Sequence, residues 1–278
     1  MPITTLQSAV EHHQAGRMGQ AEAIYRELLE SNPAQPDALN LLGALCSQTD
    51  RNDEALQWLQ KAVQSKDDFI SAHYNYGNAL IKADRLEEAE AQLRIVIKLD
   101  PSHASAHFNL GSTLSAMQRP EDALPSYREA TRIQDDHHQA WHHMGLLLFQ
   151  LGQYEPAAEC WRSALRAEPK RPDYHHNLGH IMQSMGKHES AADSYLAALE
   201  IEPKSAPTRC NLASTLRVLG RLEEASKQCW LVIEAEPCYA DAYRNMANIQ
   251  SDLGHASEAV ELLARAVAIE QQATDATE

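Results

Sequence analysis

The stretch that decides the fold is His138–Arg171, which reads HQAWHHMGLLLFQLGQYEPAAECWRSALRAEPKR. In its first half, apolar residues recur at helical spacing from Trp141 to Leu148, and the turn sequence Leu-Gly-Gln-Tyr follows. In its second half, the same spacing returns around Trp161, and Pro169 closes the segment. This pattern predicts two short amphipathic helices joined by a tight turn.

The same pattern returns every 34 residues on both sides of this stretch. Its twentieth position is always alanine: Ala21, Ala55, Ala89, Ala123, Ala157, Ala191, Ala225 and Ala259. Its eighth position is always small: Ala9, Gly43, Gly77, Gly111, Gly145, Gly179, Ala213 and Ala247. Small side chains at two fixed positions predict that the two helices approach closely, since a larger side chain there would force them apart.

Eight such units follow one another without an insertion. They span residues 2–35, 36–69, 70–103, 104–137, 138–171, 172–205, 206–239 and 240–273, and a short tail covers 274–278. Stacked repeats bury one continuous core, so we predict a single array over residues 1–273. Pro125 lies inside a predicted second helix, where it removes a hydrogen bond and should kink that helix.

Composition restricts the kind of partner. The net charge of −15 argues against nucleic acid and against an anionic membrane surface, and leaves a neutral or basic protein partner.

No apolar stretch approaches membrane-spanning length, and the N-terminus does not resemble a signal peptide. The five cysteines show no metal-site or disulfide spacing, so we expect unpaired thiols and a cytoplasmic location.

The repeat length and the spacing of these residues resemble the tetratricopeptide repeat family. The resemblance implies an all-α fold, a right-handed α-solenoid (superhelix) of eight antiparallel helix-turn-helix units. It also implies that the first helices of the units line a concave groove. The array further resembles the N-terminal repeat arm of O-linked N-acetylglucosamine transferase-like bacterial proteins.

The sixth position of the units carries a run of asparagines along the predicted groove. Its members are Asn75, Asn109, Asn177, Asn211 and Asn245, interrupted by His143. Asparagine is a poor residue in the middle of a helix, so these positions need a reason. One explanation is a hydrogen bond to the neighbouring unit. The other is a ladder of amides that binds the backbone of an extended peptide, as the transferase resemblance implies.

The neighbouring fifth and ninth positions complete the predicted partner-binding groove. They add Tyr74, Phe108, His142, His176, His180, Arg244 and Asn248. Tyr74 and Phe108 form an aromatic patch that could anchor an apolar side chain.

The histidines allow two further hypotheses. His138 and His142 lie one turn apart, as do His176 and His180, and such a pair can hold a metal ion. No carboxylate is evidently placed to orient the rings, so we predict no metal and no other cofactor. A second hypothesis is pH-dependent partner binding, because several groove imidazoles would gain charge on acidification from neutral pH.

Enzyme motifs are absent from the sequence, which predicts a non-catalytic protein–protein interaction scaffold. One alternative is the substrate-recruiting repeat arm of a larger glycosyltransferase or sulfotransferase. Another is a self-assembling scaffold that associates through its C-terminal edge. We expect that edge to be uncovered at Leu262, Ala266 and Ile269.

Overall fold

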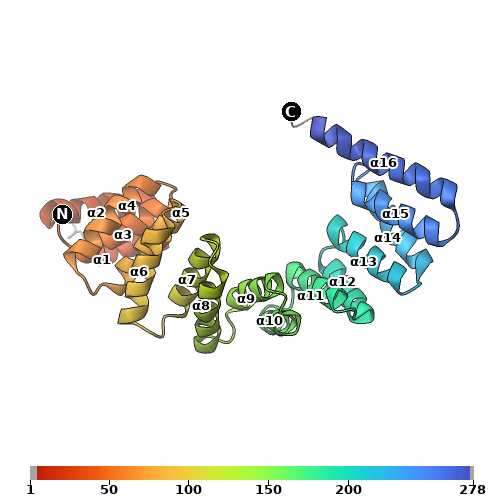
Figure 1. Ribbon diagram of the computed structural model, residues 1–278. Helices are drawn as coiled ribbons and strands as arrows, with labels where there is room; N and C mark the ends of the chain where they lie inside the picture. Colours follow the sequence, from red (N-terminus) through yellow and green to blue (C-terminus); the bar gives the residue numbers. More distant parts are fainter. Residues whose placement is uncertain (1–4, 276–278) are drawn as a thin grey trace. The chain divides into compact units, whose positions relative to one another are not determined.

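The computed structural model describes residues 5–275, apart from the side chains of residues 273 and 275, and this part of the chain consists of helices joined by short turns (Figure 1). It contains sixteen helices and no strand over those residues. The chain divides into two compact units, Met1–Asp135 and Asp136–Glu278, and each is described by itself.

The helix boundaries repeat every 34 residues. The first unit contains α1 (Leu6–Gln14), α2 (Met18–Ser31), α3 (Pro36–Gln48), α4 (Asn52–Ser65), α5 (Ile70–Lys82), α6 (Leu86–Leu99), α7 (Ala104–Ala116) and α8 (Pro120–Ile133). The second unit contains α9 (His138–Gln150), α10 (Tyr154–Ala167), α11 (Pro172–Ser184), α12 (His188–Ile201), α13 (Ala206–Val218), α14 (Leu222–Ala235), α15 (Ala240–Asp252) and α16 (Ala256–Asp275). Each odd-numbered helix packs against the helix that follows it, which confirms the predicted all-α stack of helical hairpins.

Small residues at the eighth position make room for large residues at the twenty-fourth. A Cβ atom added to Gly179 would lie 2.7 Å from the ring of Tyr195, and one added to Gly111 would lie 2.8 Å from the ring of Tyr127. The eight alanines of the twentieth position are buried. The predicted reason for the small residues, close approach of the two helices, is therefore confirmed.

Every hairpin turn has a residue with a left-handed backbone conformation, that is with positive φ, at the same position. Five of these turn positions are glycine, with φ between 71° and 85°. The other three are Asp50, Asp84 and Gln118, with φ of 58°, 57° and 58°. The turn geometry is thus kept without glycine, at two aspartates, which enter the left-handed region more readily than most residues, and at Gln118, which does not share that preference.

Three details concern the predicted helix ends and edges. Helix α8 runs as one helix from Pro120 to Ile133 with Pro125 inside it. Helix α16 continues to Asp275, two residues beyond the end of the last predicted unit at residue 273; residues 276–278 lie outside the described part. Gln271 stands where most units have a proline, and glutamine lets a helix continue.

The predicted uncovered edge of the last hairpin is also corrected. Ala266 and Ile269 are buried, and Leu262 is half-buried, because this side of α16 packs on α15. The exposed apolar side chains are instead Val260 and Val267, with Leu263 between them. None of the helices in the described part combines the length and the hydropathy that a membrane span requires.

A matched pair of substitutions tests the close approach. At Gly43 a Cβ atom would lie 2.5 Å from Leu59 Cγ and 3.2 Å from the Leu59 backbone nitrogen, whereas at Gly77 it would lie 3.2 Å from Leu93 Cγ. Gly43→Ala should lower the free energy of unfolding by about 1–3 kcal/mol through overpacking. Gly77→Ala should be close to neutral, because alanine also gains about 1 kcal/mol of helix propensity. Urea unfolding followed by circular dichroism measures both, and equal effects would contradict the packing argument.

A reciprocal pair tests the turn. Gln118→Gly should raise the free energy of unfolding by about 1 kcal/mol, because glycine adopts positive φ without a clash of its side chain. Gly152→Gln should lower it by about 1–2 kcal/mol for the same reason. Thermal unfolding measures both changes, and two shifts of the same sign would show that the turn conformation is not what matters.

Candidate functional site

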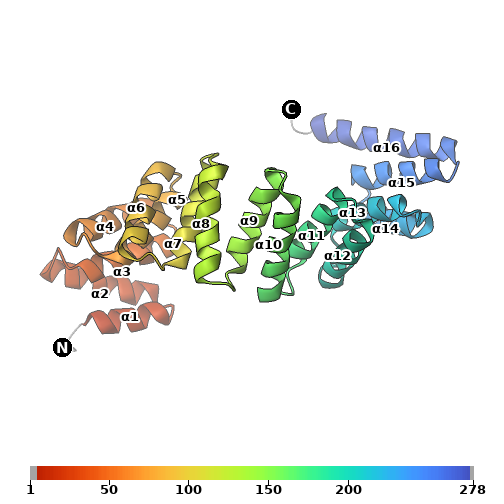
Figure 2. The same cartoon turned by 60° about the horizontal axis from the view of Figure 1, so that its bottom comes forward.

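The predicted site residues lie on the first helices of the hairpins, which neighbour one another within each unit (Figure 2). Helix α5 contacts α3 and α7 in the first unit, and α13 contacts α11 and α15 in the second. The fifth, sixth and ninth positions therefore fall on adjacent helices in each unit, as the repeat predicts.

In the first unit the asparagine amides bind the preceding hairpin. Asn75 Nδ2 donates to Asn40 Oδ1 over 2.8 Å. Asn109 Nδ2 donates to Asn78 Oδ1 over 2.6 Å and to the Tyr74 hydroxyl over 3.2 Å. Both N–H groups of the Asn109 side-chain amide are thereby used, so its side-chain oxygen Oδ1 is the group left to meet a ligand.

In the second unit the asparagine side chains also form hydrogen bonds within the array, with one exception. Asn245 Nδ2 donates to the Cys210 carbonyl oxygen over 3.0 Å, and Asn211 hydrogen-bonds the Tyr195 side chain. Asn177 has no hydrogen bond from its side chain among residues 5–275, and its amide is half-buried at the edge of a pocket. The local explanation thus accounts for four asparagines and leaves Asn177 available.

The two aromatic residues of the proposed anchor take part in internal packing. The ring centroids of Tyr74 and His103 lie 4.8 Å apart, and those of Phe108 and Tyr127 lie 6.0 Å apart. Tyr74 and Phe108 are each half-buried, so only part of each ring is open to a partner.

His142 is held between two aromatic residues. Trp161 Nε1 donates to His142 Nδ1 over 3.1 Å, and the imidazole stacks on the Tyr174 ring with centroids 4.8 Å apart. An indole nitrogen only donates, so Nδ1 must be unprotonated and His142 carries its proton on Nε2. The Tyr174 hydroxyl also hydrogen-bonds His138 Nδ1 over 2.8 Å.

Burial makes three of the predicted groove imidazoles, those of His142, His143 and His176, less basic. Desolvation, helped by the nearby His143, lowers the pKa of His142 to about 4. Desolvation also lowers the pKa of His143 and that of His176 below the ordinary value. These three imidazoles are therefore less basic than free histidine and gain charge only at a lower pH than it does. The hypothesis of pH-dependent partner binding stays a prediction.

The histidine pairs are engaged in other contacts. His176 Nδ1 hydrogen-bonds Thr208 Oγ1 over 2.9 Å, and the His180 ring lies 5.1 Å from that of Phe149. Within the described part of the chain, no three histidine, cysteine or acidic side chains come together as a metal site would require.

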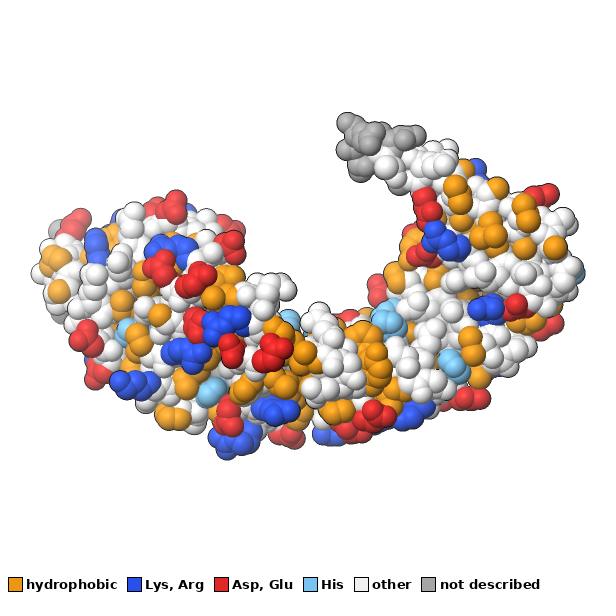
Figure 3. Space-filling model, viewed as in Figure 1, with side chains coloured by type: hydrophobic (Ala, Val, Ile, Leu, Met, Phe, Trp, Pro, Cys, Tyr) orange, Lys and Arg blue, Asp and Glu red, His pale blue; other side chains and the backbone are white. Residues whose placement is uncertain are grey.

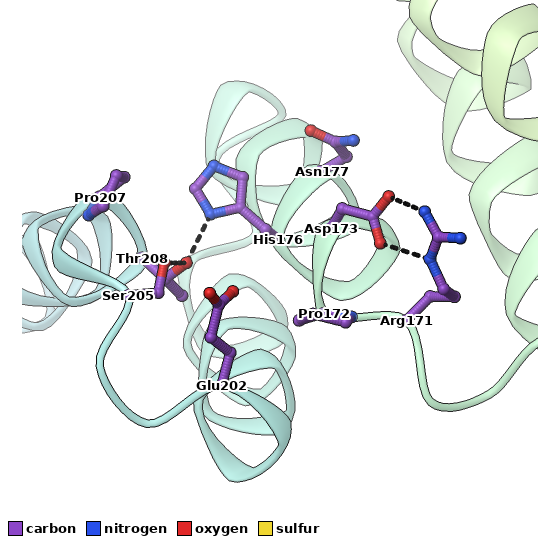
Figure 4. A pocket seen from close by; sticks show the side chains of 9 residues that line it. All are labelled: Arg171, Pro172, Asp173, His176, Asn177, Glu202, Ser205, Pro207 and Thr208. Carbon is purple, nitrogen blue, oxygen red and sulfur yellow. Dashed lines mark hydrogen bonds and ion pairs between the residues drawn. The ribbon is translucent and has the colours of Figure 1, made fainter.

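A pocket of about 440 Å³ opens beside Asn177, between the beginnings of α11 and α13 (Figure 4). It is lined by Arg171, Pro172, Asp173, His176, Asn177, Glu202, Ser205, Pro207 and Thr208. Arg171 Nε and Nη2 donate to the two oxygens of Asp173 over 2.9 and 2.7 Å. Ser205 Oγ lies 2.9 Å from Thr208 Oγ1, which extends the hydrogen bond from His176.

The far end of the predicted groove has a paired arginine. Arg244 forms ion pairs with Asp241 and Glu270. Its charge is thus compensated inside the last hairpin, while Asn248 is exposed on the same helix, α15. The four buried cysteines and the exposed Cys238 are all free thiols.

Helical hairpins of constant length, stacked with glycine or alanine at fixed positions, define the chain as an α-solenoid repeat protein. Family models agree: tetratricopeptide repeat models match residues 12–72, 74–138 and 172–273, and a TPR repeat model matches residues 145–186. The chain belongs to the tetratricopeptide repeat family.

Solved structures share the fold. The chain is similar to PilF of Pseudomonas aeruginosa, with 22% identity, a TM-score of 0.64, and coverage of 72% of this chain and 91% of that one. It is also similar to YrrB, a TPR protein, with 20% identity, a TM-score of 0.58, and coverage of 66% and 95%. A crystal structure of MamA gives 19% identity, a TM-score of 0.57, and coverage of 62% and 94%.

Curated relatives match over a short segment. The mouse protein O-mannosyl-transferase TMTC2 is 33% identical over 72 residues, which is 25% of this chain and 9% of that protein. The human protein is 32% identical over the same length. The chain therefore spans only a small part of these relatives.

Sequence reasoning missed most of the pocket. Five of its lining residues, Arg171, Asp173, Glu202, Ser205 and Thr208, lie at the junctions between hairpins or at the beginnings of helices. The groove was predicted from the fifth, sixth and ninth positions alone. A usable feature was the repeated placement of proline beside charged residues at these junctions, as in Arg-Pro-Asp and Glu-Pro-Lys-Ser.

Acid should destabilise the second unit through His142. The unfolded state takes up this proton near pH 6.5, but the folded state resists it until about pH 4, so stability falls as pH drops between these values. In His142→Gln the amide oxygen can still accept from Trp161 and cannot titrate. Urea unfolding from pH 7 to pH 4.5 should show a smaller loss of stability for the variant. Parallel losses in the two proteins would contradict the assignment.

Proposed function

We propose that this chain is a non-catalytic interaction scaffold that binds an extended segment of a protein partner along the first helices of its hairpins. The observation that carries the proposal is the set of polar side chains left available on that face of the second unit. Asn177 is without a hydrogen bond among the described side chains, and His180 and Asn248 are exposed. Their amide and imidazole groups can both donate and accept, as a peptide backbone requires.

The comparisons support this proposal at the level of the family. The solved YrrB structure is described as that of a TPR protein with an unusual peptide-binding site. A rigid stack of hairpins presents its contacts in advance, which lowers the entropy cost of binding. The net charge of −15 favours a neutral or basic partner, and the free thiols favour a cytoplasmic location.

A second candidate function is that of a repeat arm which brings substrates to a larger transferase. It is favoured by the 72-residue likeness to protein O-mannosyl-transferase TMTC2. The chain itself would then bind the substrate protein, and another part of the assembly would carry out the transfer.

Affinity capture tests the binding face. A triple variant, Asn177→Ala/His180→Ala/Asn248→Ala, removes side chains that form no hydrogen bond to a neighbouring helix, although His180 also loses its ring contact with Phe149. It should therefore fold and lose bound partner proteins. A control variant, Asp193→Ala/Lys227→Ala/Glu261→Ala, changes exposed residues of the second helices and should retain them. Mass spectrometry of the captured proteins compares the two with the wild type. Equal capture by all three proteins would refute binding at the first helices.

A further inference from the structure

The pocket between α11 and α13 has more negative than positive charge to offer a ligand. Burial raises the pKa of Asp173, but the hydrogen bonds and the charge of Arg171, with smaller contributions from its other neighbours, together lower it below the ordinary value, so this carboxylate is ionised. Arg171, the only lysine or arginine of the lining, donates from Nε and Nη2 to Asp173. Glu202 has no hydrogen bond or ion pair through its carboxylate among residues 5–275, and it is exposed. One carboxylate therefore remains uncompensated at the pocket.

The other lining groups do not add positive charge. His176 is neutral at pH 7, because burial lowers the pKa of its imidazole. The hydroxyl groups of Ser205 and Thr208 can accept hydrogen bonds, as can the amide oxygen of Asn177. In Figure 4 the Glu202 carboxylate points into the space bounded by His176, Thr208 and Asp173.

The backbone around the pocket also favours a cation over an anion. Anions bind at helix N-termini through free N–H groups. Pro172 is the first residue of α11, and Pro207 is the second residue of α13, so each helix lacks one of these donors. Glu202 is the C-cap of α12, and the carbonyl end of a helix attracts positive charge.

We propose that this pocket receives the guanidinium group of an arginine side chain from the bound partner segment. The guanidinium would pair with the Glu202 carboxylate and donate its remaining N–H groups to the neighbouring oxygens, while Pro172 and Pro207 pack against the methylene stem. A planar group with five donors suits several acceptors around one space better than a compact ammonium group does. The inference rests on the proposed function, because it assigns one contact of the bound segment.

The test uses a small probe and needs no partner protein. N-acetyl-arginine amide is titrated into the whole ¹⁵N-labelled chain, beside N-acetyl-citrulline amide, which has the same shape without the charge. The arginine probe should shift the backbone amide resonances of Asn177 and Thr208, and the citrulline probe should leave them in place. Glu202→Gln should weaken arginine binding about two- to fivefold, as expected for an exposed ion pair.

The control is the register-equivalent substitution in the next hairpin. Glu236→Gln makes the same change of charge at the C-cap of α14, away from the pocket, and should leave arginine binding unchanged. Equal shifts with citrulline, equal weakening by both substitutions, or a preference for inorganic phosphate over arginine would overturn the inference.

The two proposals fail separately. If the arginine probe leaves the pocket unchanged while the triple variant still loses its partners, the binding face stands and the arginine contact does not. If the probe binds but the triple variant keeps every partner, the pocket is real and the proposed face is not where partners bind.

Discussion

The close approach of the two helices in each hairpin is the constraint on which the rest of the structure depends. Gly111 faces the Tyr127 ring and Gly179 faces the Tyr195 ring at distances that leave no room for a Cβ atom. With a small residue on one helix, a large buried side chain can occupy the other. This pairing fixes the distance between the two helices. It thereby decides which side chains of the first helix face away from the second helix and can meet a partner.

The same constraint explains why residues at the fifth position contact the core of their hairpin and are also partly exposed on the predicted binding face. His142 accepts a hydrogen bond from Trp161 at the twenty-fourth position, and Phe108 packs near Tyr127 at the equivalent place. A residue predicted to face a partner therefore also touches the largest core residue of its own hairpin. Its chemistry is altered by that contact, as the lowered pKa of His142 shows.

The sequence predicted the fold well because a strict repeat supplies eight tests of one pattern. It predicted the site less well, because a residue's place in the repeat does not decide what its side chain bonds to. Asn245 binds the Cys210 carbonyl while Asn177, at the same place in its own unit, binds nothing among the described side chains. The end of α16 was not predicted for a related reason. Gln271 replaces the proline that ends most units, so the repeat pattern does not indicate where this helix ends.

The invariant turn has a consequence for how such a chain can change length. All eight hairpins place a left-handed residue at the same point, and three do so without glycine. One extra residue before that point would rotate every later side chain of its helix by about 100° and turn buried alanines towards solvent. Gain or loss of sequence is therefore tolerated most easily as duplication or deletion of a complete 34-residue block, which leaves the phase of every helix intact.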